Sequence, residues 1–321
     1  METKGENGAT ETPLLILSQG EPVGAHSIYD MSENLFRKLN IPTFTGKKLL
    51  GSFYGWLVLV EPLHYNDGDG DCCLFNPTTN DVIELPKLND SINYDQCVLT
   101  GPPTEQDCYI LFNGLEQAFC RIGDKEYVIR TLKQQEEEEQ ENGRVGFDNL
   151  IAIGSFQGQT YGFMDPDKFV AINFVGNTME FSRIPMVEPW VIPHDSDESG
   201  VYDVWLFSGE PLMVQKIYDD CGVVLDFLVF QIDRFDTDQI KCTEVKNIGN
   251  RTIFVSDDGV GYCRPSIGTK ANSIYYSNGD DMIIYIFDLE DRSTSMLPSS
   301  DDAAANKSIM TACWIENQQL F

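Results

Sequence analysis

Positive charge is scarce in this chain of 321 residues, which has 22 Lys and Arg against 51 Asp and Glu and a formal net charge of −29. Such a balance excludes a protein that binds phosphate backbones by default, so we expect no nucleic-acid partner. Long apolar runs are also missing. The run from Trp56 to Val60, for example, has five residues, whereas a helix that spans a bilayer needs about 20. We therefore expect no membrane partner.

Histidine and the common catalytic motifs are the next absences. The chain has three histidines, at 26, 64 and 194, and none stands beside a serine or cysteine nucleophile in a recognisable context. It contains no G-x-S-x-G elbow, no G-x-x-x-x-G-K-[ST] loop and no H-E-x-x-H zinc motif. We therefore predict no catalytic residue, no metal and no cofactor, and a protein that is not an enzyme.

Targeting signals and cysteine patterns point to a reducing compartment. The amino terminus, METKGENGATETPLLILSQGEP, is acidic and polar, without the layout of a signal or transit peptide, so we expect a cytoplasmic or nuclear protein. The nine cysteines are scattered through apolar stretches without C-x-x-C spacing. This pattern indicates reduced core thiols rather than disulfides or a zinc site.

What the chain does contain is a long series of short apolar, β-branched runs, such as GWLVLVE, LIAIGSF and MIIYIFDLE. Each ends at Gly, Pro, Asn or Asp, as strands do. One segment could form a helix, Met31 to Leu39, but it is short and lies between strand-like runs, so we interpret it as a hairpin. The fold class is all-β.

An internal repeat specifies the architecture. GSFYG at residues 51–55 returns as GSFQG at 154–158, and a spacing of 11 residues from Phe to Pro recurs at Phe75–Pro86, Phe174–Pro185 and Phe287–Pro298. Four-strand sets at about 48–86, 94–132, 148–184, 201–246 and 252–297 have the period of β-propeller blades. A sixth blade is completed by strands at both chain ends, Ala312 to Glu316 and three near Leu14, Ile28 and Phe36.

We therefore predict a disordered amino terminus at 1–12 and one domain at 13–321. This domain is a single β-propeller of six four-stranded blades whose last blade is closed by N- and C-terminal strands. Such closure removes exposed sheet edges.

Three stretches near the start carry a resemblance to a known family: SIYDMSENLFRKLNIP, KKLLGSFYGWLVLVE and CCLFNPTTNDVIELP. In this order they resemble the opening of the plant F-box-associated, Kelch-like β-propeller family. FDNLIAIGSFQGQTYGF and NSIYYSNGDDMIIYIFDLEDRS continue the similarity, which covers nearly the whole chain from about Pro13. The resemblance implies a plant protein with a non-enzymatic role in protein–protein interaction, namely substrate recognition for a ubiquitin ligase.

Complete members of that family carry a helical F-box before the propeller, which docks a Skp-type adaptor. Here 12 polar residues precede the first strand-like run. We therefore expect a monomer that does not bind a Skp-type adaptor directly. The alternative function is a carboxylate-based glycan hydrolase or lyase with its site in the central channel, because 51 acidic residues could hide a catalytic pair.

Connection lengths predict which face binds. In a propeller the connections between strands one and two, and three and four, emerge on one face, and all others on the opposite face. The long connections fall in the second set, at 63–71, 133–146, 187–199, 264–271 and 298–307. Recognition is usually placed on such loops, although unconstrained drift in loop length is an alternative.

The candidate partner-binding residues on this face are one aromatic residue and a set of charged or ionisable ones: Trp190, His194, Asp195, Asp197, Glu136, Glu137, Glu138, Glu139 and Arg264. Their acidic excess predicts a protein partner with a basic contact surface. Trp190 could equally plug the blade beneath it. The run NDGDGDCC at 66–73 resembles the start of a calcium loop, but Cys72 and Thr78 stand where Gly and Glu are needed, so we interpret it as a hairpin tip.

Overall fold

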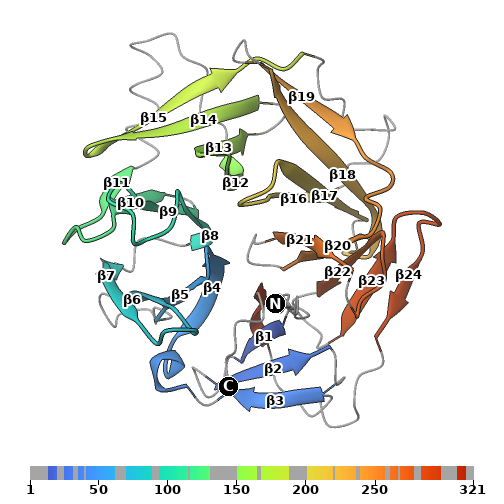
Figure 1. Ribbon diagram of the computed structural model, residues 1–321, viewed down its shortest axis with the longest axis horizontal. Helices are drawn as coiled ribbons and strands as arrows, with labels where there is room; N and C mark the ends of the chain where they lie inside the picture. The colour runs from blue at the N-terminus through green and yellow to red at the C-terminus, as the bar shows by residue number, and fades with distance from the viewer. Residues whose placement is uncertain are drawn as a thin grey trace, which may run out of the picture.

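The computed structural model describes residues 14–19, 25–31, 35–39, 41–61, 70–88, 94–114, 116–130, 150–164, 168–187, 201–219, 221–235, 239–256, 261–266, 268–277, 283–297 and 309–315. These residues form six β-sheets arranged as blades around a central axis (Figure 1). The prediction of a six-bladed propeller is therefore confirmed. Among the described residues, no helix has the length and apolar character needed to cross a bilayer.

The first three blades contain strands β25 and β1 to β11. The first blade has the order β25 (Ile309–Ile315), β1 (Leu14–Gln19), β2 (Ala25–Asp30) and β3 (Leu35–Leu39), and a 3-10 turn, η1 (Pro42–Phe44), follows it. The second blade contains β4 (Lys48–Phe53), β5 (Trp56–Val60), β6 (Gly70–Phe75) and β7 (Val82–Leu88). The third contains β8 (Tyr94–Leu99), β9 (Tyr109–Gly114), β10 (Gln117–Arg121) and β11 (Val128–Arg130).

The last three blades contain strands β12 to β24. The fourth blade contains β12 (Leu150–Phe156), β13 (Gln159–Met164), β14 (Lys168–Val175) and β15 (Thr178–Ile184). The fifth contains β16 (Val201–Leu206), β17 (Leu212–Tyr218), β18 (Val224–Phe235) and β19 (Gln239–Glu244). The sixth contains β20 (Arg251–Val255), β21 (Gly261–Pro265), β22 (Ser273–Ser277), β23 (Ile284–Asp288) and β24 (Thr294–Met296).

The hydrophobic core lies between adjacent blades. The second strand of the second blade, β5, is buried at all five positions, because both of its faces are covered by neighbouring blades. One apolar cluster joins Leu14 and Ile28 of the first blade to Leu57 of the second. Another joins Phe163 of the fourth blade to Met213 of the fifth. Each blade therefore depends on its neighbours for burial, which holds the ring together.

The first blade is assembled from both chain ends, as predicted. β1 pairs antiparallel with β25, with Leu14 opposite Ile315 and Ile16 opposite Cys313. β2 pairs with β3, with Asp30 opposite Leu35, so the interpretation of residues 31–39 as part of a hairpin is also confirmed. The ring is closed by hydrogen bonds between the two termini.

The sixth blade departs from the predicted four strands. Its order is β21-β20-β22-β23-β24, so it has five strands, and β20 and β22 run parallel. β21 is antiparallel to β20 and therefore also to β22, so the chain crosses from β21 to β22 at one end of the sheet, around the end of β20. Residues 266–272 make this connection from β21 to β22, past β20. The sequence does not reveal the change because β20 and β21 still form an ordinary antiparallel pair.

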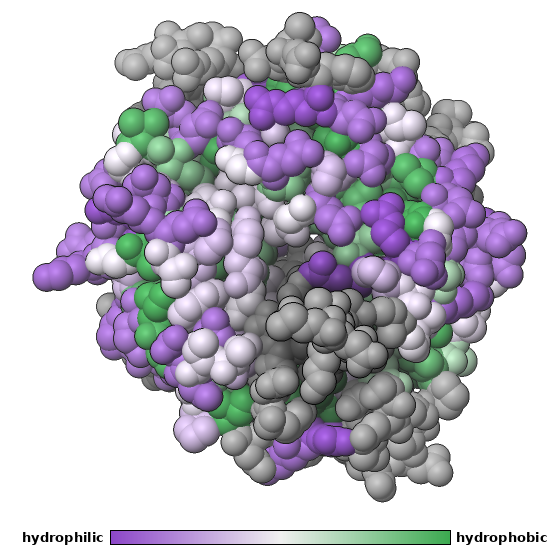
Figure 2. All heavy atoms as spheres, viewed as in Figure 1, coloured by the Kyte–Doolittle hydropathy of each residue, from purple (hydrophilic) through white to green (hydrophobic). Residues whose placement is uncertain are grey.

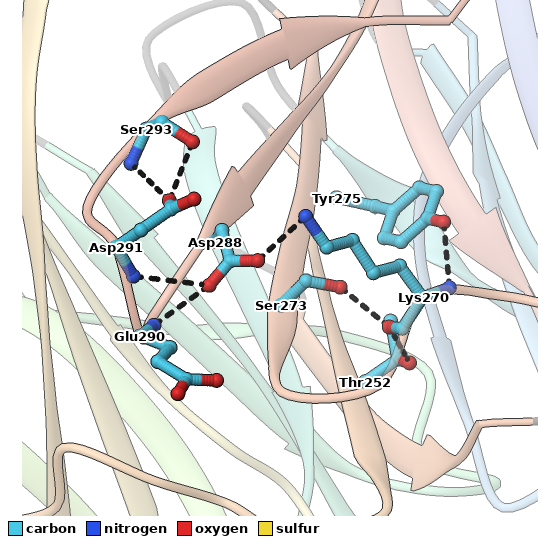
Figure 3. A network of polar contacts seen from close by, with 8 residues as sticks. All are labelled: Thr252, Lys270, Ser273, Tyr275, Asp288, Glu290, Asp291 and Ser293. Carbon is cyan, nitrogen blue, oxygen red and sulfur yellow. Dashed lines mark hydrogen bonds and ion pairs between the residues drawn. The ribbon is translucent and has the colours of Figure 1, made fainter.

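A polar network fixes the crossover (Figure 3). The buried hydroxyl of Thr252 donates to the carbonyl oxygen of Lys270 at 2.8 Å and lies 2.9 Å from the hydroxyls of both Ser266 and Thr269. Ser273 donates to the same Lys270 carbonyl at 2.6 Å. These side-chain contacts add to the backbone hydrogen bonds at the two ends of the crossover, from Ser266 N–H to the Asn250 carbonyl and from Asn272 N–H to the Arg251 carbonyl.

Candidate functional site

A cavity of about 280 Å³ lies on the propeller axis, at the end where the innermost strands finish. Its wall contains residues from five blades: Ser52, Phe53, Tyr54, Cys97, Ile153, Leu206, Phe207, Ser208, Gly209, Glu210, Gly261, Cys263 and Arg264. We call this end the channel mouth. Apolar side chains, such as those of Ile153, Leu206 and Phe207, share the wall with hydroxyl groups and with the charged groups of Glu210 and Arg264.

Exposed apolar surface outside the cavity is scattered. In the space-filling view, hydrophilic residues dominate the coloured part of the visible face, and hydrophobic residues occur singly or in small groups among them (Figure 2). Isolated exposed apolar residues are normal for soluble proteins. On the part of the surface that the structure describes, the cavity is therefore a better candidate site than a flat apolar patch.

The repeated pentapeptides form the turns beside the mouth. In GSFYG, Tyr54 and Gly55 have φ of 51° and 78°, and in GSFQG, Gln157 and Gly158 have φ of 51° and 74°. Two positive φ values in a two-residue hairpin turn are those of type I′, which favours Asn or Gly at the first position. A tyrosine is unusual there. Tyr54 lines the cavity and is 43% exposed, whereas Gln157 is not part of the cavity wall.

Ser155, in the second pentapeptide, ties the mouth together. Its hydroxyl donates to the carbonyl oxygen of Thr100 at 3.1 Å, and its N–H donates to the hydroxyl of Ser208 at 3.3 Å. The N–H of Gly209 donates to the carbonyl oxygen of Ser155 at 2.7 Å. Burial raises the pKa of Tyr54, and a hydrogen bond with the Ser155 side chain opposes this shift. Residues of four consecutive blades are thus connected at one end of the channel.

The charges in the cavity wall are a carboxylate and a guanidinium, those of Glu210 and Arg264. Glu210 pairs with Arg251, with 3.3 Å between Oε2 and Nη1. The Cys263 thiol also lines the cavity, and burial, followed by the charge of Glu210, raises its pKa to about 12. A thiol with so high a pKa stays protonated at neutral pH and is a poor nucleophile.

The predicted partner-binding residues fall in two groups. Trp190, His194, Asp195, Asp197 and Glu136 to Glu139 lie outside the described residues. Arg264 is described, and the structure places it in the wall of the channel mouth.

The assignment of residues 264–271 to the face of the long connections was wrong. β21 occupies the innermost place of its blade, so its carboxyl end reaches the mouth at which Tyr54 and Glu210 lie. The connection to β22 therefore crosses at that end. The strands β12, β16 and β25, which follow the long connections at 133–146, 187–199 and 298–307 in the chain, are instead innermost strands that begin at the opposite end of the channel.

Sequence reasoning did not select Tyr54, Ser208 or Glu210 as site residues. A signal was available, because a hydroxyl residue stands at the end of the innermost strand in four consecutive blades: Ser52, Thr100, Ser155 and Ser208. Without the structure, this recurrence cannot be told from ordinary turn chemistry, in which serine and threonine are common.

The described histidine, His26, and most of the described cysteines are packed into the fold. The buried ring of His26 lies with Nε2 at 2.7 Å from the Lys47 carbonyl and 3.2 Å from that of Phe44, and burial lowers its pKa. Six of the described cysteines are buried, Cys242 is half-buried, and Cys221 is exposed. Within the described ranges, no group of three or more His, Cys, Asp or Glu side chains could hold a metal ion.

Comparison with protein families identifies the class of propeller. The family model described as KIB1-4 beta-propeller matches residues 28–296. The chain therefore belongs to the KIB1-4 beta-propeller family. No curated protein matches the sequence.

Similarity to solved structures is weak in sequence. A protein described as a candidate 6-phosphogluconolactonase from Bacteroides fragilis is 10% identical, with a TM-score of 0.44 and coverage of 97% of this chain and 99% of that one. The Cps50 (Swd1) β-propeller domain from Myceliophteria thermophila is 11% identical, with a TM-score of 0.43 and coverage of 86% and 81%. The allergen Mala s 1 from Malassezia sympodialis is 10% identical, with a TM-score of 0.38 and coverage of 94% and 88%.

Proposed function

We propose that this chain is a non-enzymatic protein-interaction module that recognises substrates for a plant ubiquitin ligase. The observation that carries the interaction role is the channel mouth, where a small amphipathic cavity is held rigidly by hydrogen bonds between blades and is flanked by a half-exposed tyrosine. Rigid scaffolds that present aromatic side chains beside polar groups are well suited to bind proteins. The ligase role is drawn from the resemblance to the F-box-associated propellers.

The chemistry of the cavity favours binding over catalysis. A glycan hydrolase with two carboxylates needs them about 5 to 9.5 Å apart across the scissile bond. Among the residues that line the described cavity, one is a carboxylate, Glu210, and it is paired with Arg251. The neighbouring Cys263 thiol is protonated at neutral pH. The wall therefore offers neither an acid–base pair nor an activated nucleophile.

Charge and location complete the proposal. The net charge of −29 favours a partner with a basic contact surface, because long-range attraction raises association rates. We place the protein in the cytoplasm or nucleus as a monomer. We also propose that this chain alone does not bind a Skp-type adaptor, since its described residues from Leu14 onward are almost entirely propeller strands.

The test starts with affinity purification of the tagged chain from plant tissue and identification of partners by mass spectrometry. A recovered partner is then purified, and its association rate is measured as ionic strength rises from 0.1 M to 1 M, where the Debye length falls from about 10 Å to about 3 Å. We expect the association rate to fall with salt. A salt-independent rate would contradict a basic contact surface, and cleavage of aryl glycosides that is lost in Glu210→Gln would contradict the non-enzymatic role.

The adaptor prediction has its own measurement. The purified chain and a Skp-type adaptor are mixed and passed over a size-exclusion column. We expect two separate peaks. Co-elution as a stoichiometric complex would overturn this part of the proposal without affecting the interaction role.

A further inference from the structure

We infer that the channel mouth is the docking surface for the partner, and that it takes an extended peptide segment that inserts one large apolar side chain into the cavity. This inference rests on the proposed interaction function and adds the surface and the chemistry of the bound segment. It places recognition at the opposite end of the channel from the long connections that the sequence favoured.

The size and lining of the cavity suit a side chain better than a cofactor. Pockets for drug-sized ligands have volumes of about 300 to 1,000 Å³, and this cavity, at about 280 Å³, lies below that range. Several of its lining residues are apolar, among them Phe53, Ile153, Leu206 and Phe207. One Phe, Leu or Met side chain would bury its apolar surface against them, which favours binding.

The rim suits an uncharged main chain. Two of its hydroxyl groups, those of Tyr54 and Ser208, can each donate and accept hydrogen bonds. Its two charged side chains, Glu210 and Arg264, are of opposite sign. A peptide backbone offers alternating N–H donors and C=O acceptors, which this mixture of groups can satisfy. An isolated anion or cation would meet a partner of its own sign as well as one of opposite sign.

Tyr54 is the residue whose conformation indicates a binding role. It holds a left-handed φ of 51°, as Gln157 does in the matching turn of the fourth blade. This region is unfavourable for residues other than glycine, and strain of this kind is often found at functional sites. Gln157 is exposed and lies outside the cavity wall, whereas Tyr54 is half-exposed and lines it. The tyrosine therefore places an aromatic ring at the rim, where it can contact the inserted side chain.

The test uses a library of random nine-residue peptides displayed on phage. The library is selected in parallel on the immobilised wild-type chain, on Ser208→Trp, which fills the mouth, and on Gln157→Ala, the matched turn variant outside the cavity. Enriched peptides are synthesised with a fluorescent label, and their affinities are measured by anisotropy for these proteins and for Tyr54→Ala. Thermal melting checks that each variant folds, and if Ser208→Trp does not, Tyr54→Ala alone decides.

We expect wild type and Gln157→Ala to enrich the same peptides, with Phe, Leu, Met or Trp at one fixed position. Affinity should fall at least tenfold in Tyr54→Ala and Ser208→Trp, and also when the apolar residue of the peptide is replaced by Ser. The inference is overturned if wild type enriches no peptide, if Ser208→Trp enriches the same ones, or if the selected peptides share only charged residues.

The outcomes separate this inference from the proposed function. A natural partner that binds wild type and Tyr54→Ala equally well would sink the inference and leave the interaction role standing. If peptides are selected at the mouth but no partner is recovered from tissue, the docking chemistry stands and the proposed role fails.

Discussion

The fourth and sixth blades differ in the order in which the chain fills the strand positions from the axis outward. In the fourth blade, β12 to β15 follow one another outward in chain order, and the turns after β12 and β14 are tight, with positive φ at Gly158 and Gly176. In the sixth, the chain enters at the second position, fills the innermost one next, and then crosses to the third. Turn chemistry is therefore local, whereas the radial position of a strand depends on the rest of the fold.

Different contacts hold the two blades in place. Gly154 of β12 lets the innermost strands of the fourth and fifth blades approach closely, since a Cβ added there would lie 2.8 Å from the backbone oxygen of Leu206. The sixth blade also packs against the fifth, where Gly261 of β21 lies against the Phe207 ring, and it has in addition the buried hydroxyl of Thr252 and its contacts with the crossover. Strand packing is therefore common to both blades, and the side-chain hydrogen bonds at the crossover belong to the sixth.

The largest effect is expected from Gly154→Ala. The added methyl group would overlap backbone atoms of Leu206, which cannot move without shifting β16. Overpacking of this kind costs about 1 to 3 kcal/mol, and we expect the upper part of this range in the free energy of unfolding, measured by urea denaturation.

Gly101→Ala is the control for this substitution. A Cβ at Gly101 would meet one side-chain oxygen, that of Glu105, at an ordinary 3.5 Å. This variant should be neutral or slightly more stable, because alanine restricts the unfolded chain. Equal stability changes in the two variants would show that the close approach of β12 and β16 does not limit the fourth blade.

Thr252→Val should give the second largest effect, in the sixth blade. Valine keeps the shape but removes the hydroxyl that contacts Ser266, Thr269 and Lys270. Leaving buried polar groups without partners costs about 1 to 3 kcal/mol, and we expect about 1 to 2 kcal/mol. Hydrogen exchange should speed up in residues 266–277 more than in the fourth blade.

A surface threonine provides the comparison for Thr252. Thr178, in the fourth blade, donates one exposed hydrogen bond to the Val175 carbonyl at 2.8 Å, so Thr178→Val should change stability by less than about 0.5 kcal/mol. If Thr252→Val were as mild as Thr178→Val, the hydroxyl contacts of Thr252 would not be what fixes the crossover.

The same contrast explains how far the sequence could predict this molecule. GSFYG and GSFQG specify their turns through nearest neighbours, and the blade period follows from strands that succeed one another along the chain. The sixth blade could not be predicted in full. An antiparallel pair of β20 and β21 is compatible with either strand lying innermost, and Thr252 finds its hydroxyl partners 14 and 17 residues away.

The channel mouth was missed for the same physical reason. Tyr54 lies in the turn after β4, whereas Ser208 and Glu210 lie in the turn after β16. These two turns are far apart in sequence and converge only when the ring closes. The lengths of the connections predicted binding residues on the opposite face. Arg264 was predicted to lie on that face. Because β21 is the innermost strand of the sixth blade, Arg264 lies at the channel mouth instead.

The smallest effect is expected from the ion pair that links the crossover to the end of β23. Lys270 Nζ lies 2.5 Å from Asp288 Oδ2, and the two side chains are 49% and 13% exposed. The hydrogen bond from Lys270 is the main cause that lowers the pKa of Asp288, helped by the N–H groups of Glu290 and Asp291. The same pairing raises the pKa of Lys270.

These shifts set the pH range of the effect. Because the folded pKa of Asp288 lies below the ordinary 3.8, its contribution is present above that value and is lost as pH falls through the folded pKa. The contribution of Lys270 is complete below the ordinary 10.5 and is lost as pH rises through its raised folded pKa.

We expect Asp288→Asn to cost less than about 1 kcal/mol at neutral pH, since partly exposed pairs are screened by solvent, and the difference from wild type should vanish at strongly acidic pH. The pair of Lys87 with Asp71, 63% and 54% exposed, is the control, and Asp71→Asn should cost less still. The contrary outcome is a cost of Asp288→Asn that stays constant into acid. It would mean that the carboxylate acts only as a hydrogen-bond acceptor for the turn, a role that an amide can fill in part. The charge pair would then add nothing to the stability of the sixth blade.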